Sequence, residues 1–186
     1  MRVIAGLAKG HKLETKEGLD IRPTADKTKG AIFSMIGDNI YKALFLDLFS
    51  GSGSIGIEAL SRRASFCAFV ESSPENIAYI NKNLNHVSKA IENGNYMVIN
   101  KDFEDAIFLF KEKNTKFDII FLDPPYNKNL VNQAIDSIYR HNILSDFGMI
   151  IAEQGAHENP PNSDFYEIYK AKKYGTSSIY FLKKRV

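Results

Sequence analysis

The chain has 186 residues, of which 44% are hydrophobic and 25% are charged, and its formal net charge is +2. This composition suits one domain of moderate size with its own core. No apolar run approaches the roughly 20 residues of a membrane span, and the apolar stretch after Met1 is too short for a signal peptide. The single cysteine, Cys67, excludes an internal disulfide. We therefore expect a cytoplasmic protein without membrane association.

Positive charge is concentrated at the two ends of the chain. Residues 1–30 contain seven Lys and Arg against four acids, and residues 170–186 contain six against none. Because domain termini often lie close together, the two ends could form one positive face that suits a phosphate backbone. The alternative is that these side chains are only solvated.

The predicted elements begin with a small hairpin, in which residues 2–5 pair with residues 11–14. Thr24 then caps a helix over residues 24–36, weakened by Gly30 because glycine costs about 1 kcal/mol in a helix interior. From residue 43 onward, short apolar strands alternate with helices. The predicted strands are Ala43–Leu48, Phe66–Glu71, Tyr96–Asn100, Phe117–Leu122 and Met149–Glu153, and the helices between them are Ser54–Arg63, Pro74–His86, Phe103–Lys113 and Leu130–His141.

This regular alternation predicts an α/β fold with a parallel sheet and helices on both faces. The end of the chain differs, since residues 166–173 and 178–184 flank a turn and predict a β-hairpin. The expected architecture is therefore a mostly parallel, seven-stranded sheet with a C-terminal antiparallel hairpin. A small N-terminal β-hairpin precedes it.

A glycine-rich loop follows the first predicted strand. Gly51, Gly53 and Gly56 have the G-x-G-x-x-G spacing between a strand and a helix. Such glycines allow a tight turn and a close approach of the backbone to a ligand, beside a helix N-terminus. Glu71 ends the second strand 20 residues after Gly51, where an acid can hold ribose hydroxyls. The loop predicts a nucleoside cofactor.

Asp47, at the end of the first strand, narrows the choice of cofactor. A nicotinamide dinucleotide would place its pyrophosphate at the loop, and this carboxylate would repel it. An acid there can instead accept hydrogen bonds from an α-amino group, which favours S-adenosylmethionine. Asp102 follows the third strand and could reach the adenine amino group, with Phe103 against the ring. It could equally serve only as the N-cap of the next helix.

The tetrapeptide Asp123-Pro124-Pro125-Tyr126 ends the fourth strand. Two prolines stop the strand and stiffen the corner, at the edge where open α/β sheets bind ligands. An acid, outward carbonyls and an aromatic ring together suit a planar group that carries an amino function. Taken alone, Asp-Pro and Pro-Pro also occur in ordinary turns.

These motifs, in this order, resemble the Rossmann-like class I methyltransferases that act on amino groups. The segments 2–6, 9–13 and 22–27 also resemble the start of the RsmD family, bacterial enzymes that methylate guanine N2 in 16S ribosomal RNA of the small subunit. The resemblance extends from residue 1 to the closing hairpin. It departs at Gly30, near which family members commonly carry an acid.

The resemblance implies S-adenosylmethionine as the cofactor and ribosomal RNA, or the small ribosomal subunit, as the partner of a monomer. Residues 1–23 would be an RNA-binding extension of a methyltransferase domain formed by residues 24–186. The catalytic residues would be Asp123, Pro124, Pro125 and Tyr126. The cofactor would contact Asp47, Phe49, Gly51, Gly53, Glu71, Asp102, Phe103 and Asp123. RNA would contact Arg2, Lys9, Lys12, Arg22, Thr24 and Lys27.

Three other functions are compatible with the same motifs. The first keeps the methyl donor but acts on adenine N6 in DNA or on a protein glutamine, because similar corners serve those amino groups. The second is a nicotinamide-dependent oxidoreductase, favoured by the glycines and opposed by Asp47. The third is an RNA-binding factor without catalysis. The four histidines show no metal-ligand spacing, so we expect no metal.

Overall fold

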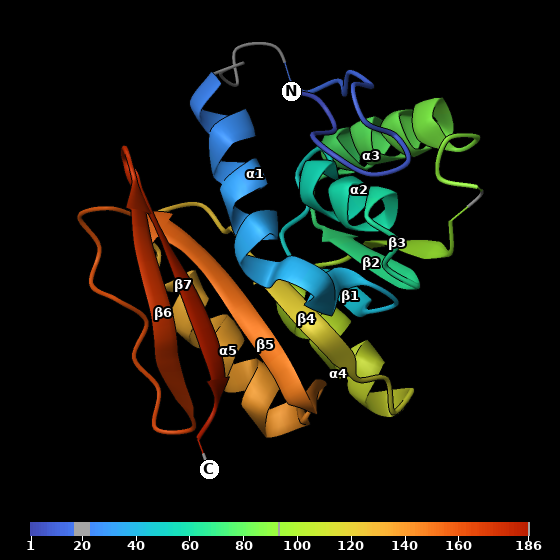
Figure 1. Cartoon of the computed structure of the whole chain (residues 1–186). Coiled ribbons are helices and arrows are strands. Elements are labelled where there is room, and N and C mark those ends of the chain that lie inside the picture. The colour runs from blue at the N-terminus through green and yellow to red at the C-terminus, as the bar shows by residue number, and fades with distance from the viewer. Residues whose placement is uncertain (17–22, 93, 186) are drawn as a thin grey trace.

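The computed structural model describes residues 1–16, 23–92 and 94–185 (Figure 1). Its helices are α1 (Pro23–Ile36), the 3-10 helix η1 (Gly37–Ile40), α2 (Ser54–Ser61), α3 (Pro74–Val87), α4 (Phe103–Glu112) and α5 (Leu130–His141). Its strands are β1 (Leu44–Asp47), β2 (Phe66–Glu71), β3 (Tyr96–Asn100), β4 (Phe117–Leu122), β5 (Leu144–Gly155), β6 (Tyr166–Tyr174) and β7 (Ser177–Lys184).

The seven strands form one sheet in the order β3-β2-β1-β4-β5-β7-β6. Strands β1 to β5 are parallel, and β7 runs antiparallel to both β5 and β6. The predicted α/β class, the seven strands and the closing antiparallel hairpin are therefore confirmed. The order places β1 and β4 side by side at the centre, so the glycine loop and the tetrapeptide leave the sheet at neighbouring points.

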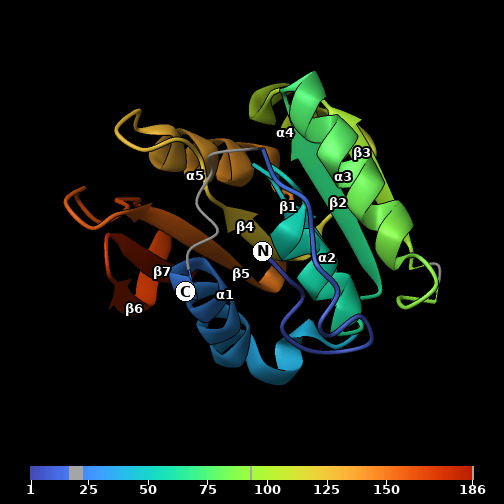
Figure 2. The same ribbon diagram turned by 90° about the horizontal axis from the view of Figure 1, so that it is seen from above.

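Helices cover both faces of the sheet (Figures 1 and 2). Successive side chains of a strand point to opposite faces: Phe45 packs in the core with α1, α2 and α3, and Leu46 packs in the core with α4 and α5. Because both faces are buried, the central strands are apolar throughout rather than alternating. Cys67 is buried in the first of these cores.

The boundary of β5 differs from the prediction. The strand begins at Leu144 rather than at Met149, and its pairing with β4 shifts register between Phe117 and Ile119. The hydroxyl of Ser145 donates to the Phe117 carbonyl at 2.7 Å, and Phe147 points fully into solvent. The first residues of β5 are irregularly paired and partly polar. They lack the apolar run by which the strand was predicted, so the prediction began too late.

The predicted N-terminal strands are not formed. One isolated bridge joins Arg2 to Lys12. Backbone hydrogen bonds from Val3 N to His11 O, Gly10 N to Val3 O and Leu13 N to Met1 O join the two segments around this bridge. The pairing ends there because the N–H groups of Ile4 and Ala5 donate to the carboxylate of Glu58 on α2, at 2.8 and 3.0 Å. The segment is nevertheless held in place, since its apolar side chains join the core beside α1 and α2; these are Val3, Ala8 and Leu13. The domain boundary at residues 23 and 24 stays a prediction.

The basic residues of the C-terminal end are spread along β6 and β7. Lys172 and Lys173 pair with Ile179 and Ser178, next to Ser177, which lines the same cavity as Met1. A single positive face formed by both ends of the chain therefore stays a prediction. Met1 lies at the carboxyl edge of the parallel strands, where it lines a cavity. Strand β7 is antiparallel and ends at the other edge, where Lys183 and Lys184 form ion pairs with Glu167 and Asp146. Within the described residues, no helix is long and apolar enough to cross a membrane.

Candidate active site

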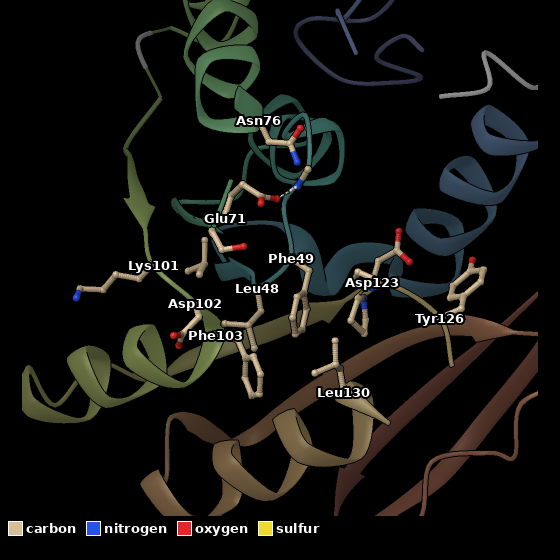
Figure 3. Close-up of a pocket in the computed structure, with 15 residues that line it drawn as sticks. Leu48, Phe49, Glu71, Asn76, Lys101, Asp102, Phe103, Asp123, Tyr126 and Leu130 are labelled. Atoms are coloured by element: carbon tan, nitrogen blue, oxygen red, sulfur yellow. Dashed lines mark hydrogen bonds between the residues drawn. The ribbon is translucent and has the colours of Figure 1, made fainter. Parts of the chain in front are cut away.

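Two cavities lie at the carboxyl ends of the central strands, with volumes of about 610 and 630 Å³. Figure 3 shows the first of them. Both volumes are typical of small-molecule sites. The cavities share five lining residues and therefore adjoin: Phe49, Gly51, Asn76, Asp123 and Tyr126. The first extends toward Glu71 and Asp102, and the second toward Asp47 and Glu153. Together they form one cleft, which we call the active-site cleft.

The three glycines of the loop are required for different reasons. Gly51 and Gly53 have φ of +53° and +80°, a region that other residues adopt at a cost. Gly56 lies where α2 crosses β2, and a Cβ there would approach Phe69 Cε1 to 2.3 Å. The fingerprint therefore gives a tight turn at the start of α2 and a close contact between α2 and the sheet, as the spacing predicts.

The first cavity contains the residues predicted for the adenosine half of the cofactor. Glu71 accepts hydrogen bonds from the N–H groups of Gly51 and Ser73, at 2.9 and 2.8 Å. The rings of Phe49 and Phe103 lie 5.4 Å apart between their centroids and form an apolar wall. Asp102 is the N-cap of α4, since its Oδ1 accepts from Asp105 N at 2.9 Å.

Asp47 is buried at the end of β1 and faces the second cavity. Burial raises the pKa of its carboxyl to about 7, a rise supported by the negative charge of Glu71 and opposed by the hydrogen bond from Gly56 N. That hydrogen bond is 3.1 Å long. In the described part of the chain, no ion pair compensates this carboxylate, so a cationic or N–H-bearing ligand would stabilise its charged form.

The tetrapeptide corner is held by two glutamates, Glu153 near the end of β5 and Glu158 in the turn that follows it. Glu158 accepts from Asn127 N at 3.2 Å and from Gly155 N at 2.9 Å, which fixes the chain after the prolines. The hydroxyl of Tyr126 donates to Glu153 Oε1 at 3.3 Å and lies 3.1 Å from Ser177 Oγ. Burial is the main cause that raises the pKa of Tyr126 to about 12. The exposed ring of Tyr126 therefore has a defined orientation.

Asp123 is exposed on the open cleft. Desolvation by the protein around its carboxyl, followed by repulsion from Glu153 and Asp47, raises the pKa of Asp123 well above its usual range. Desolvation also raises the pKa of Glu153, which hydrogen bonds from Ser177 and Tyr126 oppose. No sequence motif includes Glu153. Its position as the acid that ends the strand next to β4 could have indicated it.

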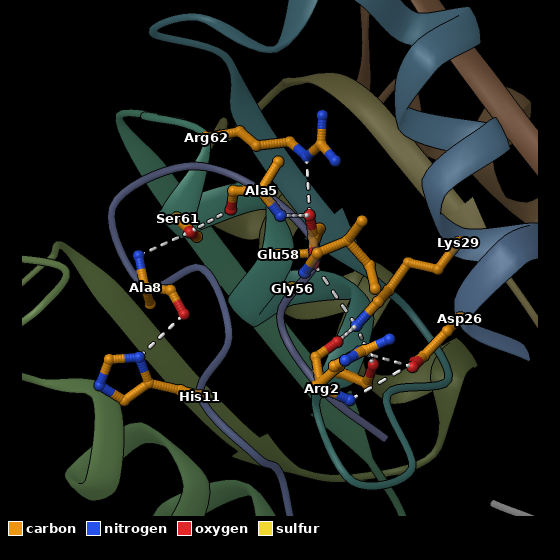
Figure 4. Close-up of polar contacts among 12 residues, drawn as sticks. Arg2, Ala5, Ala8, His11, Asp26, Lys29, Gly56, Glu58, Ser61 and Arg62 are labelled. Carbon is orange, nitrogen blue, oxygen red and sulfur yellow. Dashed lines mark hydrogen bonds and ion pairs between the residues drawn. The ribbon is translucent and has the colours of Figure 1, made fainter. Parts of the chain in front are cut away.

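Lys29 is a second residue that the motifs did not indicate (Figure 4). Its Nζ donates to the Arg2 carbonyl at 2.7 Å and to Ser54 Oγ at 2.9 Å, and lies 3.5 Å from Glu58 Oε2. Burial lowers the pKa of Lys29, and Glu58 opposes this shift. Lys29 thereby joins the first residues of the chain to the N-terminus of α2, where it lines the second cavity.

The residues predicted to contact RNA lie between residues 2 and 27. Lys9, Lys12 and Lys27 are exposed, and Arg2 forms an ion pair with Asp26 at 3.3 Å. The loop that carries Lys9 packs on the C-terminal end of α2, since Leu7 N and Ala8 N donate to Ser61. That end of α2 lies away from the cleft, because α2 begins at the glycine loop.

Two of these predicted residues cannot be placed in the same way. Arg22 lies outside the described residues, and Thr24 is described only by its helical backbone in α1. An RNA role for the six residues stays a prediction. Within residues 1–16, 23–92 and 94–185, no group of three or more His, Cys, Asp or Glu side chains could hold a metal ion.

Comparison with known proteins identifies the family of the chain. A family model described as Conserved hypothetical protein 95 matches residues 1–183. YlbH of Bacillus subtilis is 36% identical over 187 residues, which cover all of both chains. Ribosomal RNA small subunit methyltransferase D of Haemophilus influenzae is 38% identical over 154 residues, which cover 82% of this chain and 78% of that protein.

Solved structures share the fold. The structure of yhhF from Escherichia coli superimposes with a TM-score of 0.85 at 25% identity, covering 100% of this chain and 98% of that one. SMU.776, solved in complex with SAH, has a TM-score of 0.66 at 17% identity over 88% of this chain and 50% of that one. The latter likeness concerns the fold alone. The chain therefore belongs to the family of Conserved hypothetical protein 95, to which YlbH and ribosomal RNA small subunit methyltransferase D are related, and the RsmD-family resemblance of the sequence is confirmed.

Proposed function

We propose that this protein transfers a methyl group from S-adenosylmethionine to the exocyclic N2 of a guanine in the RNA of the small ribosomal subunit. One observation carries the proposal: the glycine loop and the Asp123–Tyr126 corner both line the active-site cleft. A nucleoside cofactor and a planar amine can thus meet there. Family membership supports the choice of ribosomal RNA as the acceptor.

The residues of the cleft fit S-adenosylmethionine. Asp47 presents a buried carboxylate to an α-amino group, and Glu71 presents one to the ribose hydroxyls. The apolar wall of Phe49 and Phe103 suits the adenine ring, and Asp102 retains a second carboxylate oxygen for the adenine amine. A nicotinamide dinucleotide fits less well, because its pyrophosphate would meet the carboxylates of Asp47 and Glu71.

Bound S-adenosylmethionine would supply an activated methyl carbon, with its sulfur as the leaving group that keeps the electron pair of the broken bond. The chain itself has to present the nitrogen. The lone pair of the guanine amine is delocalised into the ring, and acceptors for both N–H bonds favour a pyramidal nitrogen. Asp123 and the outward carbonyl of Pro124 would provide these acceptors. Such positioning can lower a barrier by roughly 7–11 kcal/mol in favourable cases.

The proton released from the methylated nitrogen needs an acceptor. Asp123 is the nearest candidate, and the raised pKa of its carboxyl makes it a better proton acceptor than an ordinary aspartate. The target base has to leave its stack, at a cost of a few kcal/mol. Stacking on the ring of Tyr126 would return about 1–3 kcal/mol, and the hydrogen bonds of its hydroxyl to Glu153 and Ser177 hold this ring ready.

The test offers three acceptors to the purified protein with labelled S-adenosylmethionine. These are small ribosomal subunits from a strain that lacks the enzyme, DNA with unmethylated adenines, and total protein from the same strain. We expect label in RNA alone. Label in DNA or protein, with none in RNA, would move the acceptor to adenine N6 or glutamine and would contradict the proposal.

A further inference from the structure

Two carboxylates, rather than one, border the acceptor side of the cleft. Asp123 follows β4, and Glu153 lies at the end of β5, which pairs with β4. Both line the second cavity together with Tyr126 and Ser177. The negative charge of Glu153 acts on Asp123 strongly enough to contribute to its raised pKa, so the two groups lie close together. The Asp-Pro-Pro-Tyr motif accounts for only the first of them.

The carboxylate of Glu153 is oriented by the Tyr126 hydroxyl, which is itself held by Ser177. Its Oε1 accepts from the Tyr126 hydroxyl at 3.3 Å, and that hydroxyl lies 3.1 Å from Ser177 Oγ on β7. Because β7 pairs with β5 through Gln154 and Ser178, Ser177 belongs to the rigid sheet rather than to a loose loop. Each carboxylate oxygen can accept more than one donor. Glu153 can therefore hold Tyr126 and still accept a hydrogen bond from a base in the cleft.

The competing acceptors differ in the group that lies beside their amine. Guanine presents an N1–H donor next to its N2 amine. Adenine presents the N1 acceptor next to its N6 amine, and a glutamine side chain presents a carbonyl oxygen next to its nitrogen. An ionised carboxylate beside Asp123 would therefore pair with guanine, whereas it would repel the lone pairs of adenine and of glutamine. An N1–H donor in turn stabilises the ionised form of the carboxylate.

We propose that Glu153 selects guanine, by accepting the N1–H bond of the base whose N2 amine is held at the Asp123–Tyr126 corner. This inference rests on the proposed function and extends it, because the tetrapeptide alone suits all three amines. Glu153 is thus a specificity residue that contacts the substrate and does not take part in methyl transfer. A site that pairs with a donor discriminates strongly against an analogue that lacks it, because its own polar group is left unpaired.

The test replaces the target guanosine by 2-aminopurine riboside, which keeps the N2 amine but has an acceptor at N1. The methylated guanosine is first located in natural subunits. Subunits are then reconstituted with either base, and kcat/KM is measured with each. We expect the wild-type enzyme to prefer guanine by at least about 100-fold. Glu153→Gln, whose amide can donate to the N1 acceptor, should reduce this preference by at least about tenfold.

Tyr126→Phe is the matched control, because it removes the hydroxyl that contacts Glu153 while leaving the carboxylate. It should lower activity on both bases and keep their ratio. If Glu153→Gln also kept the ratio, Glu153 would act only by positioning Tyr126 and the inference would be overturned. If the wild-type enzyme methylated neither natural nor reconstituted subunits, the proposed function itself would fail, which is a different result.

Discussion

The carboxylates in two parts of this molecule have opposite surroundings. Glu58 lies on α2 beneath the N-terminal segment, and its side chain is 0% exposed. It accepts hydrogen bonds from two backbone N–H groups of that segment and forms ion pairs with Lys29 and Arg62, at 3.5 and 2.8 Å. Asp47, Asp123 and Glu153 surround the cleft, and no ion pair compensates them among the described residues. Their pKa values are all raised by desolvation.

This contrast separates a structural role from a functional one. A buried charge is tolerated when partners satisfy it, and it is costly when they do not. Glu58 is satisfied by the protein itself and therefore holds the N-terminal segment on the fold. The carboxylates of the cleft are left for a ligand to satisfy, and strongly perturbed groups of this kind cluster at functional sites. The following predictions test whether the two groups differ in this way.

The largest effect is expected from Asp123→Asn. The amide keeps the size of the side chain but replaces one acceptor for the target amine by a donor, so kcat should fall by about 10³-fold. S-adenosylmethionine affinity, measured by isothermal titration, should change by less than about threefold, since Asp123 is at the acceptor side. Asp118→Asn on the same strand is the control, because Asp118 binds Leu44 N and Ser145 at the other edge.

Glu58→Ala should affect stability rather than chemistry directly. It leaves Lys29 buried without its ion-pair partner, and breaking a buried pair costs about 3–5 kcal/mol of the free energy of unfolding. Urea denaturation measures this loss. Glu75→Ala, which breaks the exposed pair with Lys16, should not shift the midpoint measurably. A similar loss in both variants would show that burial and pairing of Glu58 are not what anchors the segment.

The raised pKa of Asp47 should make pH act in opposite directions on the free energy of unfolding and on the affinity for S-adenosylmethionine. This pKa is raised from 3.8 to about 7, so the folded state holds a proton that the unfolded state releases. Stability therefore falls as pH rises from about 4 to 7, by at most about 4 kcal/mol. Affinity for S-adenosylmethionine should instead rise about tenfold between pH 6 and 8, because the ionised carboxylate binds the amino group. Asp47→Asn should flatten both profiles.

The smallest effects concern two glycines and should have opposite signs. Gly56→Ala brings a Cβ within 2.7 Å of Cys67 Sγ and closer still to Phe69, and we expect a loss of about 1–3 kcal/mol from overpacking. Gly30→Ala meets only Ile4 Cγ2, at 3.7 Å, in the interior of α1. It should stabilise the protein by about 0.4–1 kcal/mol. Thermal unfolding of the two variants measures both; a loss in Gly30→Ala would point to a packing role for Gly30.

The fold was predictable because its central strands carry unmistakable local signals. Apolar runs such as Phe117–Leu122 and the alternation with helices determine a parallel sheet. The N-terminal hairpin was predicted too long. Residues 1–3 pair with residues 10–13, but Ile4 and Ala5 bind Glu58, more than 50 residues away, and no local pattern indicates that contact. The start of β5 was not predicted because the side chains there face solvent or bind the Phe117 carbonyl, which leaves no apolar pattern.

The candidate site was predictable where a motif and its strand end coincide. Asp47, the glycines, Glu71 and the tetrapeptide each follow a strand, and the sheet order brings these ends together. Glu153 and Lys29 were missed for a different reason. Each enters the cleft through the packing of a neighbouring element, β5 or α1, and no short motif includes it. Such residues are found only once the neighbours of a strand or helix are known.

The most direct test of the account is the identity of the nucleoside that receives the methyl group. Small subunits from a strain lacking the enzyme are incubated with the protein and labelled S-adenosylmethionine, and their RNA is digested to nucleosides for mass spectrometry. The account predicts label in N2-methylguanosine, abolished by Asp123→Asn and retained by Asp118→Asn. Label in N6-methyladenosine, or on a ring carbon, would contradict both the assigned acceptor and the role given to the carboxylates of the cleft.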